Sequence, residues 1–528
     1  MPWLTLVVFL PALAGVIVLL APSRAAKWIA AAFTLVVVGI SLYLYFGLLN
    51  GSATNFGDVL HPQWFESQPW INVTLGGFHF QINYALGVDG LSLPMVFLNA
   101  LLTFLAVVSS WRIEKRPRFY MAMLLFLETG VMGVFTSFDL FLFILFWEVE
   151  LIPMFLLIGI WGGARREYAA WKFLIYTLVG SSFTLAGIFF IYVQTGAVNA
   201  TFQHFANPVV AGSLNGSMTL LGATVSLPLV LFLLLFTGFA VKIPMWPVHT
   251  WLPDAHTEAP TAVSVLLAGV LLKMGAYGLI RICLGFVPHG AMEFAPVLGI
   301  FAAINVLWGA GASMVQQDMK KMIAYSSVSH MGYVLLGVAG AAAVATTGAG
   351  ADLASFRQAA LTGATLQMFT HGAITGMLFF CVGVVYEKAH TRNIDAFGGI
   401  AEVMPKESTL YSFACFASLG LPALAGFVAE YLVFTGSYAL LPVQTILSVF
   451  GVVLTAGYLL WMLRRSFFGP LNKAWAWLTD ANPLEWFPLV SLAVVILFVG
   501  VYPLPIVDLL TPSLHQMLTT LQPIVASR

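Results

Sequence analysis

A small set of ionisable side chains lies within long apolar stretches of this sequence, and these are the residues that could do chemistry. A charge at the centre of a membrane helix costs about 2.5 to 3.5 kcal/mol on insertion scales. Partners, internal water or neutralisation can offset that cost, and all three suit a path for ions. The set comprises Lys242, Lys273, Glu128, Glu148, Glu150 and Glu430.

Glu148 and Glu150 are only two positions apart in the chain. At about 100° per residue, their side chains point about 200° apart on a helix, so they cannot share one face. Only one of them can pair with Lys242, and the geometry alone leaves open which one does. Glu128 is a second candidate partner for this lysine, with a hydrogen-bonded packing residue as the alternative reading.

Three histidines could pass protons between such groups. His330 follows three serines, and His371 follows a glutamine and a threonine. These polar stripes can hydrate a path or simply satisfy hydrogen bonds between helices. His249 comes seven residues after Lys242, nominally on the same helix face, but two prolines intervene, so both a relay and a packing role stay open.

Metal and cofactor chemistry finds little support in the sequence. The segment 254–258 contains Asp, His and Glu, but it lies between two prolines and reads better as a cytoplasmic turn that caps the next helix. Cys283, Cys381 and Cys415 stand in apolar runs without C-x-x-C spacing, so they predict neither a disulfide framework nor a zinc or iron–sulfur site. We predict no metal and no cofactor on this chain.

The composition dictates a membrane protein around these residues. Apolar residues make up 60% and charged residues 8% of the 528 positions, and the mean hydropathy is +0.94. Soluble domains carry roughly a quarter charged residues. The net charge is zero, which gives no basic field for nucleic acid. Soluble enzymes, secreted scaffolds and DNA-binding proteins are therefore excluded.

The apolar runs predict an all-α polytopic protein with about 14 transmembrane helices. The first run, 2–22, has no basic residue ahead of it and reads as a membrane span, not as a cleavable signal peptide. The spans lie near 2–22, 27–49, 86–111, 119–136, 138–161, 171–194, 226–250, 260–286, 294–315, 322–342, 358–386, 409–436, 442–464 and 485–510.

The basic residues orient these spans. Most lysines and arginines fall at alternate connections, whereas the long connections 50–85 and 196–225 contain none. By the positive-inside rule, both termini face the outer side of the membrane. We expect this to be a bacterial inner membrane, with both termini on its periplasmic side. Arg281, near the outer end of its span, is expected to extend its charged end towards the interface.

Two spans are interrupted beside a charged residue. Pro244 follows Lys242 by two positions, and the segment 420–426, with a proline at its centre, precedes Glu430. Broken helices are tolerated in a membrane only beside protein, water or a cavity. The interrupted spans, numbers 7 and 12, lie five spans apart, which predicts two inverted five-helix repeats formed by spans 4–8 and 9–13. We expect a single membrane domain with N-terminal helices in 1–111, repeats in 119–286 and 294–464, and a C-terminal helix and tail in 485–528.

Three segments, 146–154, 249–260 and 264–278, resemble the antiporter-like subunits of respiratory complex I. The similarity covers roughly residues 110 to 470, and the motif around Lys273 is its most specific part. Subunits of Mrp-type cation/proton antiporters share this motif and are the alternative family reading.

The resemblance implies roles for the charged residues. It favours Glu148 as the partner of Lys242 in a coupling ion pair, and leaves Glu150 to a neighbouring helix or the headgroup region. It implies that Lys273 is the central proton carrier and Glu430 the terminal one. His330 and His371 would be polar relays between them.

The resemblance also implies a proton-translocating membrane-arm subunit of an NADH:quinone oxidoreductase. Such a chain is part of an enzyme but holds no redox centre, so flavin, iron–sulfur clusters and quinone would sit on partner subunits. The expected partners are the other membrane subunits, especially the homologous antiporter-like chains L and N, and the lipid bilayer. In the alternative, an Mrp-type antiporter, the same residues would exchange cations for protons under an existing gradient.

Overall fold

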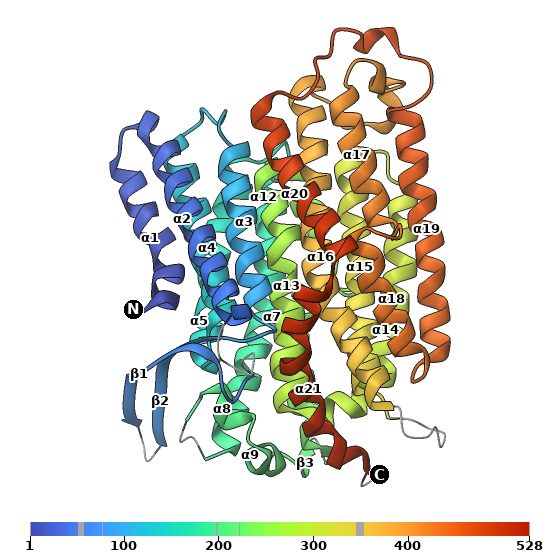
Figure 1. Cartoon of the computed structure of the whole chain (residues 1–528). Helices are drawn as coiled ribbons and strands as arrows, with labels where there is room; N and C mark the ends of the chain where they lie inside the picture. Colours follow the sequence, from blue (N-terminus) through green and yellow to red (C-terminus); the bar gives the residue numbers. More distant parts are fainter. Residues whose placement is uncertain are drawn as a thin grey trace.

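The computed structural model describes residues 2–50, 58–75, 78–196, 199–220, 222–344 and 353–526. Its helices stand side by side in one bundle, drawn nearly upright in Figure 1. Within these residues, 11 helices are long and apolar enough to cross a membrane, and two shorter apolar helices accompany them. The predicted polytopic helical fold is confirmed.

The N-terminal part contains a hairpin that the sequence reading missed. Strands β1 (Gln63–Leu75) and β2 (Phe78–Val88) pair antiparallel. The predicted span 86–111 therefore starts too early, because its first residues complete a strand rich in aromatic and β-branched side chains. The helices of this part are α1 (Trp3–Leu20), α2 (Ser23–Asn50), α3 (Leu93–Ser109) and α4 (Pro117–Thr136).

The predicted span 138–161 is broken in the middle. It consists of α5 (Leu140–Val149) and α6 (Leu151–Trp161), which meet at Glu150. Pro153 follows three residues later and has no N–H group for the Val149 carbonyl. The missing bond loosens the chain where Glu150 leaves the helix. Beyond α6, α7 (Arg166–Gln194) is continuous.

Both predicted interruptions are confirmed. Helix α10 (Leu227–Lys242) ends at the lysine itself, and the second interruption separates α17 (Pro405–Ser418) from α18 (Ala425–Tyr438). The segment expected to be a turn at 254–258 is instead part of a short helix, α11 (Trp251–Glu258). Pro253 is compatible with the first turn of this helix, where its missing N–H group is not needed. Pro260 follows the end of the helix.

Lys273 lies in a span that is buried inside the bundle over its whole apolar length. This span comprises α12 (Thr261–Leu266), a π-helical segment η1 (Leu267–Leu271), α13 (Leu272–Gly278) and a second π-helical segment η2 (Leu279–Leu284). All of its apolar window is buried inside the protein. Single π-helical turns are often found at functional sites.

The second half of the chain packs around two further central helices. They are α15 (Met319–Ala342) and α16 (Leu353–Ala389), whose apolar windows are 94% and 100% buried. The predicted last span, 485–510, is two helices, because Pro503 and Pro505 follow the end of the first one. The remaining helices are α14 (Pro288–Met314), α19 (Pro442–Ser466), α20 (Pro483–Val501) and α21 (Leu504–Ala526).

Short elements occupy the two ends of the bundle. The hairpin β1–β2 and the short elements α8 (Phe202–Phe205), α9 (Pro208–Ser213), β3 (Ser217–Leu220) and β4 (Ala223–Ser226) lie at the end drawn at the bottom of Figure 1. The connection between α19 and α20 lies at the opposite end. Short 3-10 turns, η3 (Ile394–Ala396), η4 (Ile400–Glu402) and η5 (Lys473–Trp475), belong to the connections around α17 and α19.

Arg281 is not extended towards an interface, contrary to the sequence expectation. Its side chain is fully buried, and Nη2 donates to Asp89 Oδ1 at 2.6 Å. The Nε group donates to the Tyr277 hydroxyl at 3.3 Å. Asp89 comes just before α3, far from Arg281 in the chain, so the sequence offered no sign of the pair. The ion pair joins the start of α3 to the end of the span that carries Lys273.

We expect Arg281→Met to destabilise the protein strongly. The substitution leaves the fully buried Asp89 carboxylate without its cation, and breaking a buried pair in this way costs about 3 to 5 kcal/mol. Thermal unfolding of the purified assembly should show a lower midpoint. The double variant Asp89→Asn with Arg281→Met should recover part of the loss, and an unchanged midpoint in the single variant would contradict this account.

Candidate functional site

Lys242 forms a buried ion pair with Glu150. The lysine is 1% exposed and the glutamate is fully buried, and the Lys242 ammonium donates directly to Glu150 Oε1. The ammonium also lies 5.3 Å from the centre of the Trp147 ring and 5.6 Å from that of Phe173. Aromatic faces attract a cation, so they add to the carboxylate in offsetting the burial of this charge.

The predicted pairing of Lys242 with Glu148 is therefore wrong. The two glutamates do point in different directions, as the helix geometry requires, but it is Glu150 that faces the lysine. Glu148 is only partly buried and takes part in no ion pair of the described residues. The break between α5 and α6 at Glu150 places its side chain, and Pro153 was the sequence signal that could have shown it.

Glu128 is buried but does not contact Lys242. Both of its carboxylate oxygens lack a hydrogen-bond partner among the described residues, and only its backbone carbonyl accepts a bond, from Asn99 Nδ2 at 3.4 Å. Two residues further along α4, Gly130 lies directly against Glu150. At about 100° per residue, Glu128 points about 200° away from Gly130 and so to another face of α4, and it is not a member of the pair.

The interruption after Lys242 is stabilised by one asparagine. Asn305 of α14 accepts from the Trp246 N–H at 2.6 Å and donates to the Pro244 carbonyl at 3.4 Å. It thereby pairs backbone groups that the broken helix leaves free inside the membrane. His249 lies beyond this break. Its Nε2 accepts from Trp308 Nε1 at 3.2 Å, and its Nδ1 has no hydrogen-bond partner in the part of the chain that the structure describes. No hydrogen bond of the described residues connects His249 to Lys242.

Lys273 is fully buried, and no carboxylate of the described residues forms a salt bridge with it. Its ammonium donates to the Ala268 carbonyl and lies 2.6 Å from His371 Nδ1. A charged lysine is only a donor, so the Nδ1 atom of His371 must accept and its proton must sit on Nε2. That Nε2 is buried and has no hydrogen-bond partner among the described residues. Lys273 and His371 can therefore exchange a proton directly.

His330 continues the series from His371 towards Glu430. The two imidazole rings lie 5.5 Å apart between centroids, and His330 Nε2 lies 3.7 Å from Glu430 Oε1. Its Nδ1 faces the Ser326 carbonyl at 2.8 Å and its Nε2 the Ser418 carbonyl at 2.9 Å. A neutral imidazole has only one N–H group to donate. Both carbonyl oxygens therefore receive a hydrogen bond only when the ring is protonated on both nitrogens.

Glu430 is held at the second interrupted helix. Ser418, whose carbonyl faces His330, is the last residue of α17, and Glu430 lies in the second turn of α18. Gly420 between them has φ of +78°, and a methyl group there would sit 2.6 Å from Glu430 Oε2. A glycine is needed at this position for both the backbone conformation and the close approach.

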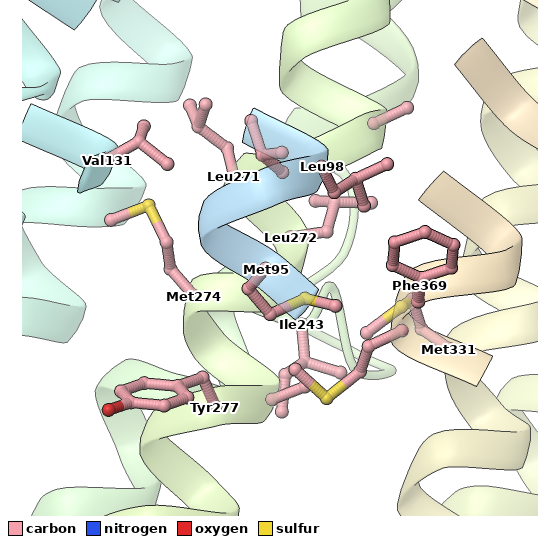
Figure 2. Packing of buried hydrophobic residues seen from close by; sticks show 14 of the residues in the cluster. Met95, Leu98, Val131, Ile243, Leu271, Leu272, Met274, Tyr277, Met331 and Phe369 are labelled. Carbon is pink, nitrogen blue, oxygen red and sulfur yellow. The ribbon is translucent and has the colours of Figure 1, made fainter. Parts of the chain in front are cut away.

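Apolar side chains flank both Lys242 and Lys273. Ile243, next to Lys242, and Leu272 and Met274, on either side of Lys273, belong to one buried cluster, shown in Figure 2. No hydrogen bond or ion pair of the described residues joins the two lysines. The backbones are nevertheless in close contact, because a methyl group on Gly275 would sit 3.0 Å from the Ile243 nitrogen.

The described residues contain no group of three or more histidine, cysteine or acidic side chains that could hold a metal ion. Cys283, Cys381 and Cys415 are buried free thiols. The arrangement suits proton transfer between ionisable side chains: one ion pair, and a separate series from Lys273 through His371 and His330 to Glu430.

Comparison with known proteins agrees with this arrangement. Residues 137–455 match the family model described as NADH:quinone oxidoreductase/Mrp antiporter, and residues 64–133 match that of the NADH-ubiquinone oxidoreductase chain 4 amino terminus. NADH-quinone oxidoreductase subunit M of Rhodobacter capsulatus is 40% identical over 97% of this chain and 96% of its own. The chain belongs to the chain 4, or subunit M, branch of this family.

Further relatives extend the match in sequence and structure. An NAD(P)H-quinone oxidoreductase chain 4 of Thermosynechococcus vestitus is 39% identical over 95% of this chain and 89% of its own. A chain of respiratory complex I from Thermus thermophilus superposes with a TM-score of 0.82 at 26% identity, covering 98% of this chain and 99% of that one. A chain of the Mrp complex from Dietzia sp. DQ12-45-1b shares the fold, with a TM-score of 0.79 at 20% identity over 99% and 98% of the two chains.

Proposed function

We propose that this chain carries protons across the membrane through its buried series of ionisable side chains, as a membrane-arm subunit of NADH:quinone oxidoreductase. The observation that carries the proposal is the series Lys273, His371, His330 and Glu430. Lys273 Nζ lies 2.6 Å from His371 Nδ1, the rings of His371 and His330 lie 5.5 Å apart between centroids, and His330 Nε2 lies 3.7 Å from Glu430 Oε1. Membership of the chain 4 branch supports the oxidoreductase over an antiporter.

In the proposed cycle, Lys273 is the central carrier and Glu430 the terminal one. Protonated Lys273 gives a proton to His371, whose Nδ1 accepts it while Nε2–H is released towards His330. For the ring to accept this proton, protonated His330 has first given its own proton to Glu430, 3.7 Å away. The ion pair of Lys242 and Glu150 acts as the switch, because making or breaking it changes the charge near Lys273 without passing a proton across the apolar cluster.

The redox chemistry is assigned to partner subunits. Flavin, iron–sulfur clusters and quinone would be held there, with the homologous chains L and N as membrane neighbours. The long helix α7 supports a place within a membrane assembly, since its outer face carries exposed aromatic and aliphatic residues such as Trp171, Ile175 and Phe183. We place the complex in a bacterial inner membrane, with the basic connections on the cytoplasmic side and both termini on the periplasmic side.

Co-purification separates this function from an Mrp-type antiporter. An affinity tag on this chain should bring down an assembly that shows flavin and iron–sulfur absorbance and oxidises NADH with a quinone. An assembly without these absorbances that exchanges sodium for protons would instead establish the antiporter. The tag can be inserted into the exposed part of the connection after α19, at 468–474, away from the buried series.

A further inference from the structure

The ion pair and the last step of the buried series lie in different halves of the chain. Lys242 ends α10, whereas His330 belongs to α15 and Glu430 to α18. Among the described residues, no hydrogen bond or ion pair joins Lys242 to either of the other two. A movement at the ion pair can therefore reach the last step only through groups that lie between them. The inference that follows rests on the proposed function and names one such group.

Asn305, in α14, has hydrogen-bond partners on two sides. Its side chain is fully buried. On one side it contacts the interruption after α10, because Oδ1 accepts from the Trp246 N–H and Nδ2 donates to the Pro244 carbonyl. On the other side Nδ2 donates to the Val328 carbonyl of α15 at 3.1 Å. An amide has one oxygen and two N–H groups to give, so this single side chain uses all of them to tie the interruption to α15.

Helices α14 and α15 are in direct backbone contact beside Asn305. Ser329 Oγ of α15 donates to the Val306 carbonyl of α14 at 2.9 Å. A methyl group on Gly309 would lie 2.5 Å from the Ser329 nitrogen, and one on Gly332 would lie 2.9 Å from the Val306 nitrogen. Small residues allow helix backbones to approach this closely. Because the two helices interlock here, a displacement of Asn305 carries α15 with it.

His330, two residues after Val328, faces groups from other helices. Its Nε2 lies 2.9 Å from the Ser418 carbonyl of α17 and 3.7 Å from Glu430 Oε1 of α18. A separation of 3.7 Å is just beyond hydrogen-bond distance, so a shift of about 0.5 Å makes or further opens this contact. The position of α15 relative to α18 therefore decides whether the imidazole and the carboxylate can exchange a proton directly.

We propose that Asn305 is a positioning residue that couples the ion pair of Lys242 and Glu150 to proton transfer between His330 and Glu430. When the pair forms or breaks, the end of α10 moves, and the backbone just beyond it pulls on the amide. The amide carries α14 and α15 with it, and the distance from His330 to Glu430 changes. Asparagine does not titrate, so it transmits position and passes no proton itself.

Structures of four forms of the assembled oxidoreductase, determined in lipid nanodiscs by electron cryomicroscopy, test this coupling. The forms are the wild type, Glu150→Gln, Asn305→Leu and the double variant. Leucine is close to asparagine in size and has no polar group. We expect Glu150→Gln to change the separation of His330 and Glu430 by about 0.5 Å or more. The double variant should keep the separation of Asn305→Leu. An unchanged separation in Glu150→Gln overturns the proposal, as does the same change in the double variant.

Proton pumping by the same four forms gives a second readout, measured in proteoliposomes with NADH. We expect each single variant to pump about 10-fold more slowly and the double variant to pump no more slowly than Glu150→Gln, whereas independent effects would multiply to about 100-fold. A multiplied loss, or normal pumping by Asn305→Leu, overturns the coupling.

Ser313→Ala is the matched control. It removes a bond between the same two helices, from Ser313 Oγ to the Met322 carbonyl at 3.2 Å, and leaves α10 untouched. This variant should pump normally. A loss equal to that of Asn305→Leu would show that any loosening of α14 against α15 is enough, and would overturn the specific role of Asn305.

NADH oxidation with an artificial acceptor verifies assembly in every variant. Where Asn305→Leu does not assemble, the smaller Asn305→Ala takes its place in both measurements. Failure of both to assemble would assign Asn305 to folding alone and overturn the coupling. Multiplied losses leave the proposed function intact, whereas wild-type pumping by Lys273→Met would overturn the proposed function itself.

Discussion

Replacing Lys273 by methionine is expected to abolish the proton transport that depends on this subunit. Methionine keeps the length and apolar contacts of the lysine stem but cannot hold a proton, so His371 loses the group from which it accepts. Proton-to-electron stoichiometry, measured in sealed vesicles with NADH and quinone, should fall relative to wild type.

The matched control is Lys321→Met, which removes a lysine at the start of α15 outside the buried series. It should leave the stoichiometry unchanged. Wild-type stoichiometry in the Lys273 variant would show that the buried series carries no protons. Equal loss in both variants would point to a general effect of charge removal.

Glu150→Gln should impair coupling far more than Glu148→Gln. Glutamine at position 150 keeps the size of the side chain but removes the charge that faces Lys242. Two unit charges about 4 Å apart at an effective dielectric constant of 20 attract each other by about 4 kcal/mol. Moving one charge across about 150 mV requires about 3.5 kcal/mol. The pair is thus of the size needed to drive one proton, and we expect a loss of pumping of 10-fold or more.

The comparison of the two glutamate variants is decisive because they differ by two positions in the same span. Both should assemble, as judged by native gels and by NADH oxidation with an artificial acceptor. A severe defect confined to Glu148→Gln would show that the working partner of Lys242 is the residue that the family motif favours. The ion pair at Glu150 would then be a resting arrangement only.

Hydrophobicity and charge were enough to predict the membrane fold and its broken helices. Long apolar runs have few alternatives to a membrane helix, and Pro244 and Pro422 cannot donate the bonds that a continuous helix needs. The series Lys273, His371, His330 and Glu430 was also named in advance, from the resemblance and the polar neighbours of the histidines. The structure brings these four residues together, whereas their roles in proton transfer stay predictions.

Contacts that depend on how the helices are rotated and packed could not be predicted from the sequence. The motif around Glu148 was read as a continuous helix, so the break at Glu150 and the resulting partner of Lys242 were missed. Arg281 was judged from its depth in one span, because its partner Asp89 comes from a different part of the chain. His256 was read as part of a turn, and its burial became visible only with α16 packed against it.

The two π-helical segments around α13 have a mechanical consequence. A π-helical turn contains about one residue more than an α-helical turn, so a surplus residue lies on each side of the seven residues that carry Lys273. Shifting that surplus from one side to the other swivels the intervening turns by about 100° without uncoiling the helix. Gly275 packs against the backbone of Ile243, just after the end of α10. A displacement at Lys242 therefore has a direct packing contact through which to reach the turns around Lys273.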